Sequence, residues 1–247
     1  MKKSYFKIGL LALILASFAS SAMAQDTYKP IDFNLQVKSM HLWRGYKVTN
    51  GTMSGLNVYY TSKDGNFSGG LWNGQSLDGN YTEFDYYVAY NFGSGLSLSV
   101  WDINNFSDFP GADIFDYDNE TTSHFVDVTL GYQVIPELNV SWSTIVLGRD
   151  TYVDDDGSIE NAYSNYIEVN GTVYDENGVN VGLFLGGAFS FADTDSHFYG
   201  SDPNIVNIGL SVGKTITLMG HDFPVGATAM WNPEQKYGAM QFSINIF

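Results

Sequence analysis

Apolar and polar residues alternate with a period of two along most of the chain. In the final stretch, "YGAMQFSINIF", Met240, Phe242, Ile244 and Ile246 are apolar, and small or polar residues stand between them. This period predicts a β-strand with one apolar and one polar face, because successive side chains of a strand point to opposite sides. A closed barrel would pair such a last strand with the first and leave no exposed edge.

Twelve segments of this kind follow one another. They cover residues 31–43, 54–62, 66–73, 81–92, 96–103, 123–134, 138–148, 165–174, 179–190, 205–213, 224–232 and 237–247. An even number of strands of about ten residues is typical of bacterial outer-membrane barrels. We therefore predict an all-β fold, a single closed antiparallel transmembrane β-barrel of about 12 strands.

The links between these segments alternate in length. The short links are residues 63–66, 93–95, 135–137 and 175–178, and the long ones are 73–80, 104–121, 149–160 and 191–203. This order predicts short periplasmic turns at one end of the barrel and longer extracellular loops at the other. Residues 220–223 break the order, because they lengthen a link that should be short.

A soluble β-sandwich or a lipocalin-like barrel is the alternative fold, since its strands also alternate. Its outer face, however, meets water and should carry charges. Here the polar face consists mainly of Gly, Ser, Thr and Asn, and the charged residues gather in the links. This distribution favours the membrane barrel.

The first 24 residues have the pattern of a secretory signal peptide. A basic start, "MKKSYFK", precedes the apolar run "IGLLALILASFAS" and the small residues "AMA" that end at Ala24. An uncleaved anchor is the alternative, but the run is shorter than the ~20 residues of a spanning helix. We predict cleavage after Ala24, a barrel domain over 25–247, and a bacterial outer-membrane location among outer-membrane lipid.

Composition and charge narrow the class further. The chain has 17 Tyr, 17 Phe, 5 Trp and 26 Gly, and no Cys. Aromatic- and glycine-rich alternating strands suit outer-membrane barrels. Loss of Lys2, Lys3 and Lys7 with the signal peptide takes the formal net charge from −16 to −19. Such an acidic chain is not expected to bind nucleic acid.

The chain ends on an aromatic residue, Phe247. A final strand with a terminal aromatic resembles the recognition signal for the barrel-assembly machinery, which is therefore an expected partner during insertion. Phe247 lies one step out of phase with the apolar face formed by residues 240, 242, 244 and 246.

Several stretches resemble a known family. "SMHLWRGYKV", "SGGLWNG", "YTEFDYYVAYNFG" and "YGSDPNIVNIGLSVGKTI" are similar to the Gcw_chp family of TorF-type outer-membrane porins. The resemblance covers most of the chain and implies a porin, although the family's transported substrate is not established. The motif residues that carry over are Trp43, Arg44, Gly45, Trp72, Glu83 and Asp85.

The phase of the strands places several charged residues inside the barrel. They are Lys38, Glu83, Asp85, Asp127 and Glu168, with Arg44 at the rim. A carboxylate that faced lipid would cost ~2–4 kcal/mol at worst. One interpretation is a charged constriction that selects solutes. The other is a plug, in which Lys38 and Arg44 pair with the carboxylates and close a narrow lumen.

Arg44 and Gly45 are predicted to lie where the first strand meets its outer loop. Gly45 would allow a bulge or a tight bend. Arg44 would hold loop carbonyls or bind a lipid phosphate.

No metal or cofactor is expected. In the loop "RDTYVDDDGSIENA", Asp154, Asp156 and Gly157 match positions of a calcium-binding loop, but Tyr152 and Tyr163 stand where two ligands are needed. A solvated acidic loop is the expectation.

The predicted function is passive passage of small polar solutes, neutral or cationic, through a porin that is not an enzyme. One alternative is an outer-membrane lipid hydrolase that uses Ser39 and His41, although a third catalytic residue is missing and their order is reversed relative to such enzymes. The other is a structural or adhesive barrel with a closed lumen.

Overall fold

The computed structural model describes residues 28–109, 111, 113–192 and 195–247. The predicted signal peptide at 1–24 lies outside these residues. The regular structure of the described part is entirely β. Nowhere in that part is there a helix with the length and apolar character needed to cross a membrane.

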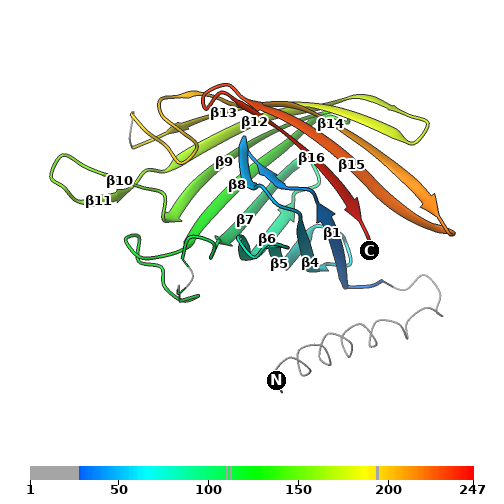
Figure 1. Cartoon of the computed structure of the whole chain (residues 1–247), viewed down its shortest axis with the longest axis horizontal. Helices are drawn as coiled ribbons and strands as arrows, with labels where there is room; N and C mark the ends of the chain where they lie inside the picture. Colours follow the sequence, from blue (N-terminus) through cyan, green and yellow to red (C-terminus); the bar gives the residue numbers. More distant parts are fainter. Residues whose placement is uncertain (1–27, 110, 112, 193–194) are drawn as a thin grey trace, which may run out of the picture. The chain divides into compact units, whose positions relative to one another are not determined.

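Twelve antiparallel strands form one closed barrel, as predicted. In their order around the wall they are β1 (Ile31–Lys38), β4 (Met53–Thr61), β5 (Phe67–Ser76), β6 (Thr82–Asn91), β7 (Leu96–Asn104), β8 (His124–Ile135), β9 (Leu138–Gly148), β12 (Ser164–Glu176), β13 (Val179–Ser190), β14 (Asn204–Leu218), β15 (His221–Asn232) and β16 (Tyr237–Asn245). Each strand pairs with the next, and β16 pairs with β1 to close the ring (Figure 1).

The seam between β1 and β16 joins the two ends of the barrel sequence. Val37 pairs with Ile244, and the Leu35 amide donates a hydrogen bond to the Phe247 carbonyl at 3.3 Å. The rings of Phe33 and Phe247 lie with their centroids 5.9 Å apart. Phe247 therefore takes part in closing the barrel.

The first strand is shorter than the pattern predicts. The alternation indicates a strand over 31–43, but β1 ends at Lys38 and the chain then leaves the wall. Two short strands, β2 (His41–Trp43) and β3 (Tyr46–Thr49), form a separate hairpin. Its turn consists of Arg44 and Gly45, with φ of 45° and 86°. Two successive positive φ angles are typical of the tight type I′ hairpin turn.

The irregular link predicted around residues 220–223 does not exist. β14 and β15 continue to Leu218 and His221, and only Met219 and Gly220 join them. Both residues have positive φ, 53° and 79°. This is again a two-residue hairpin turn, so the link is as short as the alternation requires.

The connections at the two ends of the barrel differ in length, as predicted. At one end lie residues 62–66, 92–95, 136–137, 177–178 and 219–220. At the other end lie residues 39–52, 77–81, 105–123, 149–163, 191–203 and 233–236. The connection 149–163 carries a small hairpin of β10 (Thr151–Val153) and β11 (Ile159–Asn161).

Apolar side chains point outward and polar ones inward. On β4, Leu56, Val58 and Tyr60 are exposed by 37%, 37% and 41%. Inside, the charged residues Glu83, Asp85 and Asp127 are buried. A continuous apolar exterior of this kind is what a bilayer covers in a transmembrane barrel.

Candidate functional site

The hairpin of residues 41–49, which we call the lumen hairpin, crosses the interior of the barrel. On one side the His41 ring stacks on Trp72 of β5, with centroids 5.7 Å apart. On the other side the Gly45 carbonyl accepts a hydrogen bond from Asn232 Nδ2 of β15 at 3.3 Å. β5 and β15 lie on either side of β1, and the hairpin tip reaches Asp127 of β8, five strands from β1 around the wall, so the hairpin spans the lumen.

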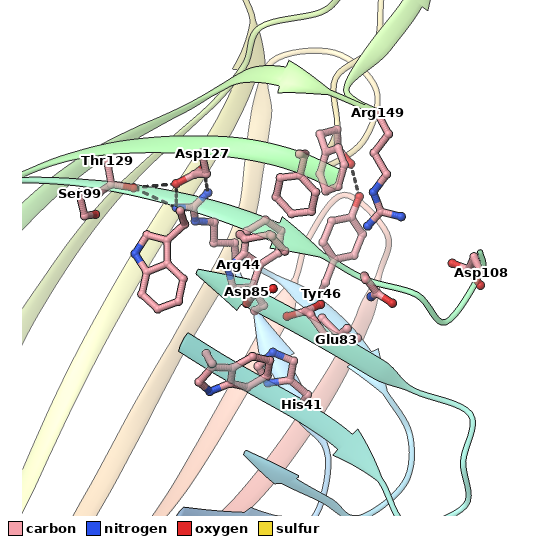
Figure 2. A pocket seen from close by; sticks show the side chains of 18 of the residues that line it. His41, Arg44, Tyr46, Glu83, Asp85, Ser99, Asp108, Asp127, Thr129 and Arg149 are labelled. Atoms are coloured by element: carbon pink, nitrogen blue, oxygen red, sulfur yellow. Dashed lines mark hydrogen bonds and ion pairs between the residues drawn. The ribbon is translucent and has the colours of Figure 1, made fainter. Parts of the chain in front are cut away.

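Arg44 at the hairpin tip is fixed to the wall by a bidentate ion pair. Its Nη1 and Nη2 donate to the two carboxylate oxygens of Asp127 at 2.6 and 2.9 Å (Figure 2). The same guanidinium donates to Tyr199 Oη at 2.8 Å and to Ser143 Oγ at 2.7 Å. Paired donors of this geometry hold a carboxylate both strongly and in one orientation.

These contacts correct the prediction for Arg44. It does not lie at the junction of β1 and its loop, and its partners are a wall carboxylate and hydroxyl groups, not loop carbonyls or lipid phosphate. Its neighbour Gly45 lies in the tight turn itself. A Cβ atom at Gly45 would lie 2.2 Å from the Val206 carbonyl oxygen, so only glycine allows the hairpin to approach β14 this closely.

A cavity of about 840 Å³ lies between the lumen hairpin and the wall. Five of the charged residues named from the sequence line it: Lys38, Arg44, Glu83, Asp85 and Asp127. Figure 2 shows Glu83 and Asp85 in this cavity together with Arg44, Tyr46 and His41. Five of the six charged residues that the strand phase predicts for the interior or its rim therefore lie together at one cavity.

Arg149, which sequence reasoning missed, also lines this cavity. It follows β9 in the connection 149–163, and its guanidinium carbon lies 5.3 Å from the ring centroid of Phe125 and 5.9 Å from that of Phe198. Its Nε is buried without a hydrogen-bond partner. Burial lowers the pKa of Arg149, and Glu83 nearby counteracts this. An arginine nevertheless stays charged in proteins.

Two of the cavity's basic groups have no close carboxylate. In the described part of the chain, neither Lys38 nor Arg149 forms an ion pair within 4.0 Å. His41 belongs to the lumen hairpin and not to a wall strand; burial lowers its pKa to about 3, and Lys38 adds to this. His41 is therefore neutral at physiological pH, and its buried Nδ1 has no partner.

Aromatic rings form much of the remaining cavity lining. Trp101 stacks on Tyr87 with centroids 4.1 Å apart. Trp43 lies 5.8 Å from Phe125 and 5.6 Å from Tyr199, measured between ring centroids. These contacts fix the rings in place, so they present a preformed apolar surface to a solute.

Glu168, the sixth charged residue predicted inside, lies apart from the cavity lining. Its carboxylate accepts hydrogen bonds from Tyr166 Oη and, at 3.3 Å, from Asn207 Nδ2. It therefore takes part in a local polar network on β12 and β14.

The two residues of the hydrolase alternative do not form a catalytic pair. Ser39 Oγ accepts a hydrogen bond from the Phe242 amide at 2.9 Å at the barrel seam. His41 stacks on Trp72 in the lumen. Among the hydrogen bonds of the described residues, none joins Ser39 to His41.

In the acidic loop of residues 149–162, Asp154 is bound by the loop's own backbone. Asp154 Oδ1 accepts hydrogen bonds from the amides of Asp156 and Ser158 at 3.0 and 2.8 Å. Throughout the described ranges, no group of three or more His, Cys, Asp or Glu side chains is arranged to hold a metal ion.

Another buried ionisable pair fastens a long connection to the wall. His124 Nδ1 lies 2.6 Å from Asp102 Oδ1, and Tyr117 Oη donates to Asp102 Oδ2 at 2.7 Å. Because Tyr117 belongs to the connection 105–123, this cluster anchors that connection to β7 and β8.

No model of a protein family matches this chain, and no curated protein matches it. Solved structures do match. The NanC porin has a TM-score of 0.51 at 8% identity, over 87% of this chain and 98% of that one. The translocator domain of the autotransporter NalP from Neisseria meningitidis has a TM-score of 0.42 at 8% identity, over 98% and 94% of the two chains. OmpF of Salmonella typhi, in complex with daunomycin, has a TM-score of 0.37 at 8% identity, over 87% and 96%. At this identity, the likeness to NanC concerns the barrel fold alone.

Proposed function

We propose that this protein is an outer-membrane channel for the passive passage of small polar solutes, neutral or cationic. The observation that carries the proposal is the cavity beside the lumen hairpin, where charged groups and fixed aromatic rings face the interior of an apolar-coated barrel. Charged side chains inside a barrel set selectivity in channels. The lumen hairpin, anchored through Arg44, would set the width of the pathway.

The remaining parts of the proposal follow from the sequence. The signal peptide would direct export, and the barrel-assembly machinery would insert the chain with its final strand and Phe247. The resemblance to the Gcw_chp family of TorF-type porins supports the same function. NanC is a porin, which agrees with the proposal at the level of the fold.

A barrel with a closed lumen is the second candidate. It is favoured by the hairpin itself, which crosses the lumen and is held on several sides. This candidate is the plug interpretation of the charged residues, and Arg44 with Asp127 is the pair that supports it.

Single-channel recording in planar lipid bilayers tests the proposal. The purified protein should produce discrete conductance steps, and a boiled sample should migrate differently from an unboiled one in electrophoresis, as closed barrels do. Heat-modifiable protein that gives no conductance steps would favour the closed barrel. Protein that is soluble without detergent and migrates identically after boiling would contradict both candidates.

A further inference from the structure

The cavity beside the lumen hairpin holds ionisable groups of both signs that form no ion pair within the described residues. Of its seven charged lining residues, Arg44 and Asp127 neutralise each other. The others are Lys38 and Arg149, which are basic, and Glu83, Asp85 and Asp108, which are acidic. Within the described residues, no basic group lies within 4.0 Å of any of these three carboxylates.

Glu83, Asp85 and Arg149 are largely removed from water, whereas Asp108 is exposed. Glu83 and Asp85 are 8% and 3% exposed. Arg149 has a buried Nε without a partner and lies over the rings of Phe125 and Phe198. Buried charges are normally paired, because burying an uncompensated charge is strongly unfavourable. Glu83 interacts electrostatically with both Lys38 and Arg149, but neither forms an ion pair with it within 4.0 Å.

Arg149 and the carboxyl groups of Glu83 and Asp85 occupy different parts of the site drawn in Figure 2. In Figure 2, Arg149 lies at one end of the drawn site, while Glu83 and Asp85 lie nearer to its middle, beside Tyr46. The rings of Trp43, Tyr46 and Trp101 are part of the lining as well. A ligand that complements the carboxyl groups, the guanidinium and the aromatic rings carries a cationic group, an anionic group and an apolar part.

We propose that the cavity binds a zwitterionic solute of the amino-acid or short-peptide class. Its ammonium group would lie against Glu83 and Asp85, its carboxylate would pair with the Arg149 guanidinium, and its side chain would pack on the aromatic rings. The inference rests on the proposed channel function, because it names the class of solute that the channel passes.

Two simpler ligands satisfy the site less well. A plain cation would be attracted by Glu83 and Asp85 but repelled by Lys38 and Arg149, and a plain anion would meet the reverse. A zwitterion has no net charge, so both sets of groups favour it. The cavity volume of about 840 Å³ lies within the roughly 300–1,000 Å³ range of small-molecule sites, which leaves room for a dipeptide.

Isothermal titration calorimetry on the purified full-length barrel in detergent tests this inference with matched probes. L-phenylalanine is the zwitterion, its amide is the cation, and N-acetyl-L-phenylalanine is the anion; the dipeptide glycylphenylalanine separates peptides from free amino acids. Because each charge-assisted hydrogen bond is worth roughly a ten- to hundredfold change in affinity, a zwitterion should bind at least about tenfold more tightly than either singly charged analogue.

Variants of the lining residues test which residues bind each end of the ligand. Glu83→Gln with Asp85→Asn should abolish the advantage of the zwitterion over its N-acetyl analogue, and Arg149→Gln should abolish its advantage over the amide. Glu137→Gln and Lys236→Gln change charges outside the cavity lining and should leave all affinities unchanged. The probe series uses only the wild-type protein, so the inference can still be tested if a variant does not fold.

Equal binding of the phenylalanine amide and phenylalanine would overturn the inference in favour of a cation site, and absence of saturable binding by every probe at millimolar concentration would also overturn it. Recording conductance on the same preparation separates the two proposals. If the barrel conducts but shows no preference for zwitterions, only the zwitterion inference is contradicted. If it binds zwitterions but never conducts, only the channel function is contradicted.

Discussion

The barrel has two unlike walls. The charged wall, which we define as β5–β8, carries Glu83, Asp85 and Asp127 on its inner face, with Trp72 paired to Asp85 and Trp101 paired to Asp127 in neighbouring strands. The neutral wall, β13–β16, carries an inward row of small or uncharged residues. That row runs through the paired positions Gly182, Ser211, Thr228 and Gln241.

The lumen hairpin is attached to the two walls in different ways. On the charged wall it is held by a side chain, through the ion pair of Arg44 with Asp127. On the neutral wall it is held mainly through its backbone: the Gly45 carbonyl accepts hydrogen bonds from Asn232 and Tyr237, and the Leu42 amide donates to Gln241. The comparison teaches that the charge that holds the hairpin lies on one wall, while the hairpin backbone forms hydrogen bonds to the other.

The largest expected effect comes from breaking the side-chain attachment. Arg44→Met leaves Asp127 buried without its partner, so we expect a loss of about 3–5 kcal/mol in the free energy of unfolding. The freed hairpin tip should also raise single-channel conductance. Urea unfolding of barrels folded in lipid bilayers and planar-bilayer recording measure the two effects.

The double variant Arg44→Met with Asp127→Leu is the control for that experiment. It removes both charges, so most of the stability should return while the conductance stays high. If Arg44→Met left both unfolding and conductance unchanged, the ion pair would not hold the hairpin.

The second prediction breaks the attachment to the neutral wall. Gly45→Ala brings a Cβ to within 2.2 Å of the Val206 carbonyl oxygen and adds a side chain at φ of +86°. The strained backbone alone costs about 1–2 kcal/mol, and the clash should add to it. The free energy of unfolding should therefore fall by more than that amount.

Gly65→Ala is the matched control for the clash. Gly65 has φ of +74°, and no atom lies within 4 Å of the position that a Cβ would take, so this change carries the backbone cost without the steric one. Equal losses in the two variants would show that the close approach to β14 contributes nothing.

The third prediction concerns selectivity. Glu83→Gln with Asp85→Asn removes the negative charge that this pair of carboxyl groups holds on the charged wall. It should lower the ratio of cation to anion permeability, most clearly at low salt where screening is weak. Reversal potentials across a salt gradient measure the ratio. Glu168→Gln removes an inward carboxylate that lies outside the cavity lining and should change the ratio less. A larger change in Glu168→Gln would place the selective charge elsewhere.

The smallest expected effects are those of pH on two connections. Burial raises the pKa of Asp150, which belongs to the connection 149–163. Hydrogen bonds from the Ser76 hydroxyl and the Asn80 amide lower the pKa of Asp78 in the connection 77–81. The two groups should therefore respond to acid in opposite directions.

For Asp150 the folded-state pKa is above the unfolded value of about 3.9, so its contribution to stability is present below that pH and is lost as the pH rises through the folded pKa. For Asp78 the contribution is present above the unfolded pKa and is lost as the pH falls through the folded one. Amide hydrogen exchange of the two connections across the acidic range measures both. Asp150→Asn and Asp78→Asn should flatten the respective profiles, and parallel profiles in the wild type would refute the assignment.

The sequence by itself determined the wall of the barrel. The period-two pattern is local, so it located all twelve strands and placed Glu83, Asp85 and Asp127 on the inner face without any knowledge of strand pairing. The short turns could also be predicted from the sequence, since residues such as Asn177 and Gly178 adopt the positive φ that a tight turn needs. The strand boundaries were wrong where the pattern ran on past Lys38 and at the link near Gly220.

Only the tertiary structure decided what lies inside the wall. Arg44 and Asp127 are 83 positions apart in sequence, and their pairing requires that the barrel has closed and that the hairpin has folded into it. Arg149 belongs to a connection without periodicity, so no local pattern indicates that it faces the cavity. The alternation of a strand fixes which face a side chain takes, whereas the partner across a lumen depends on how distant strands are brought together.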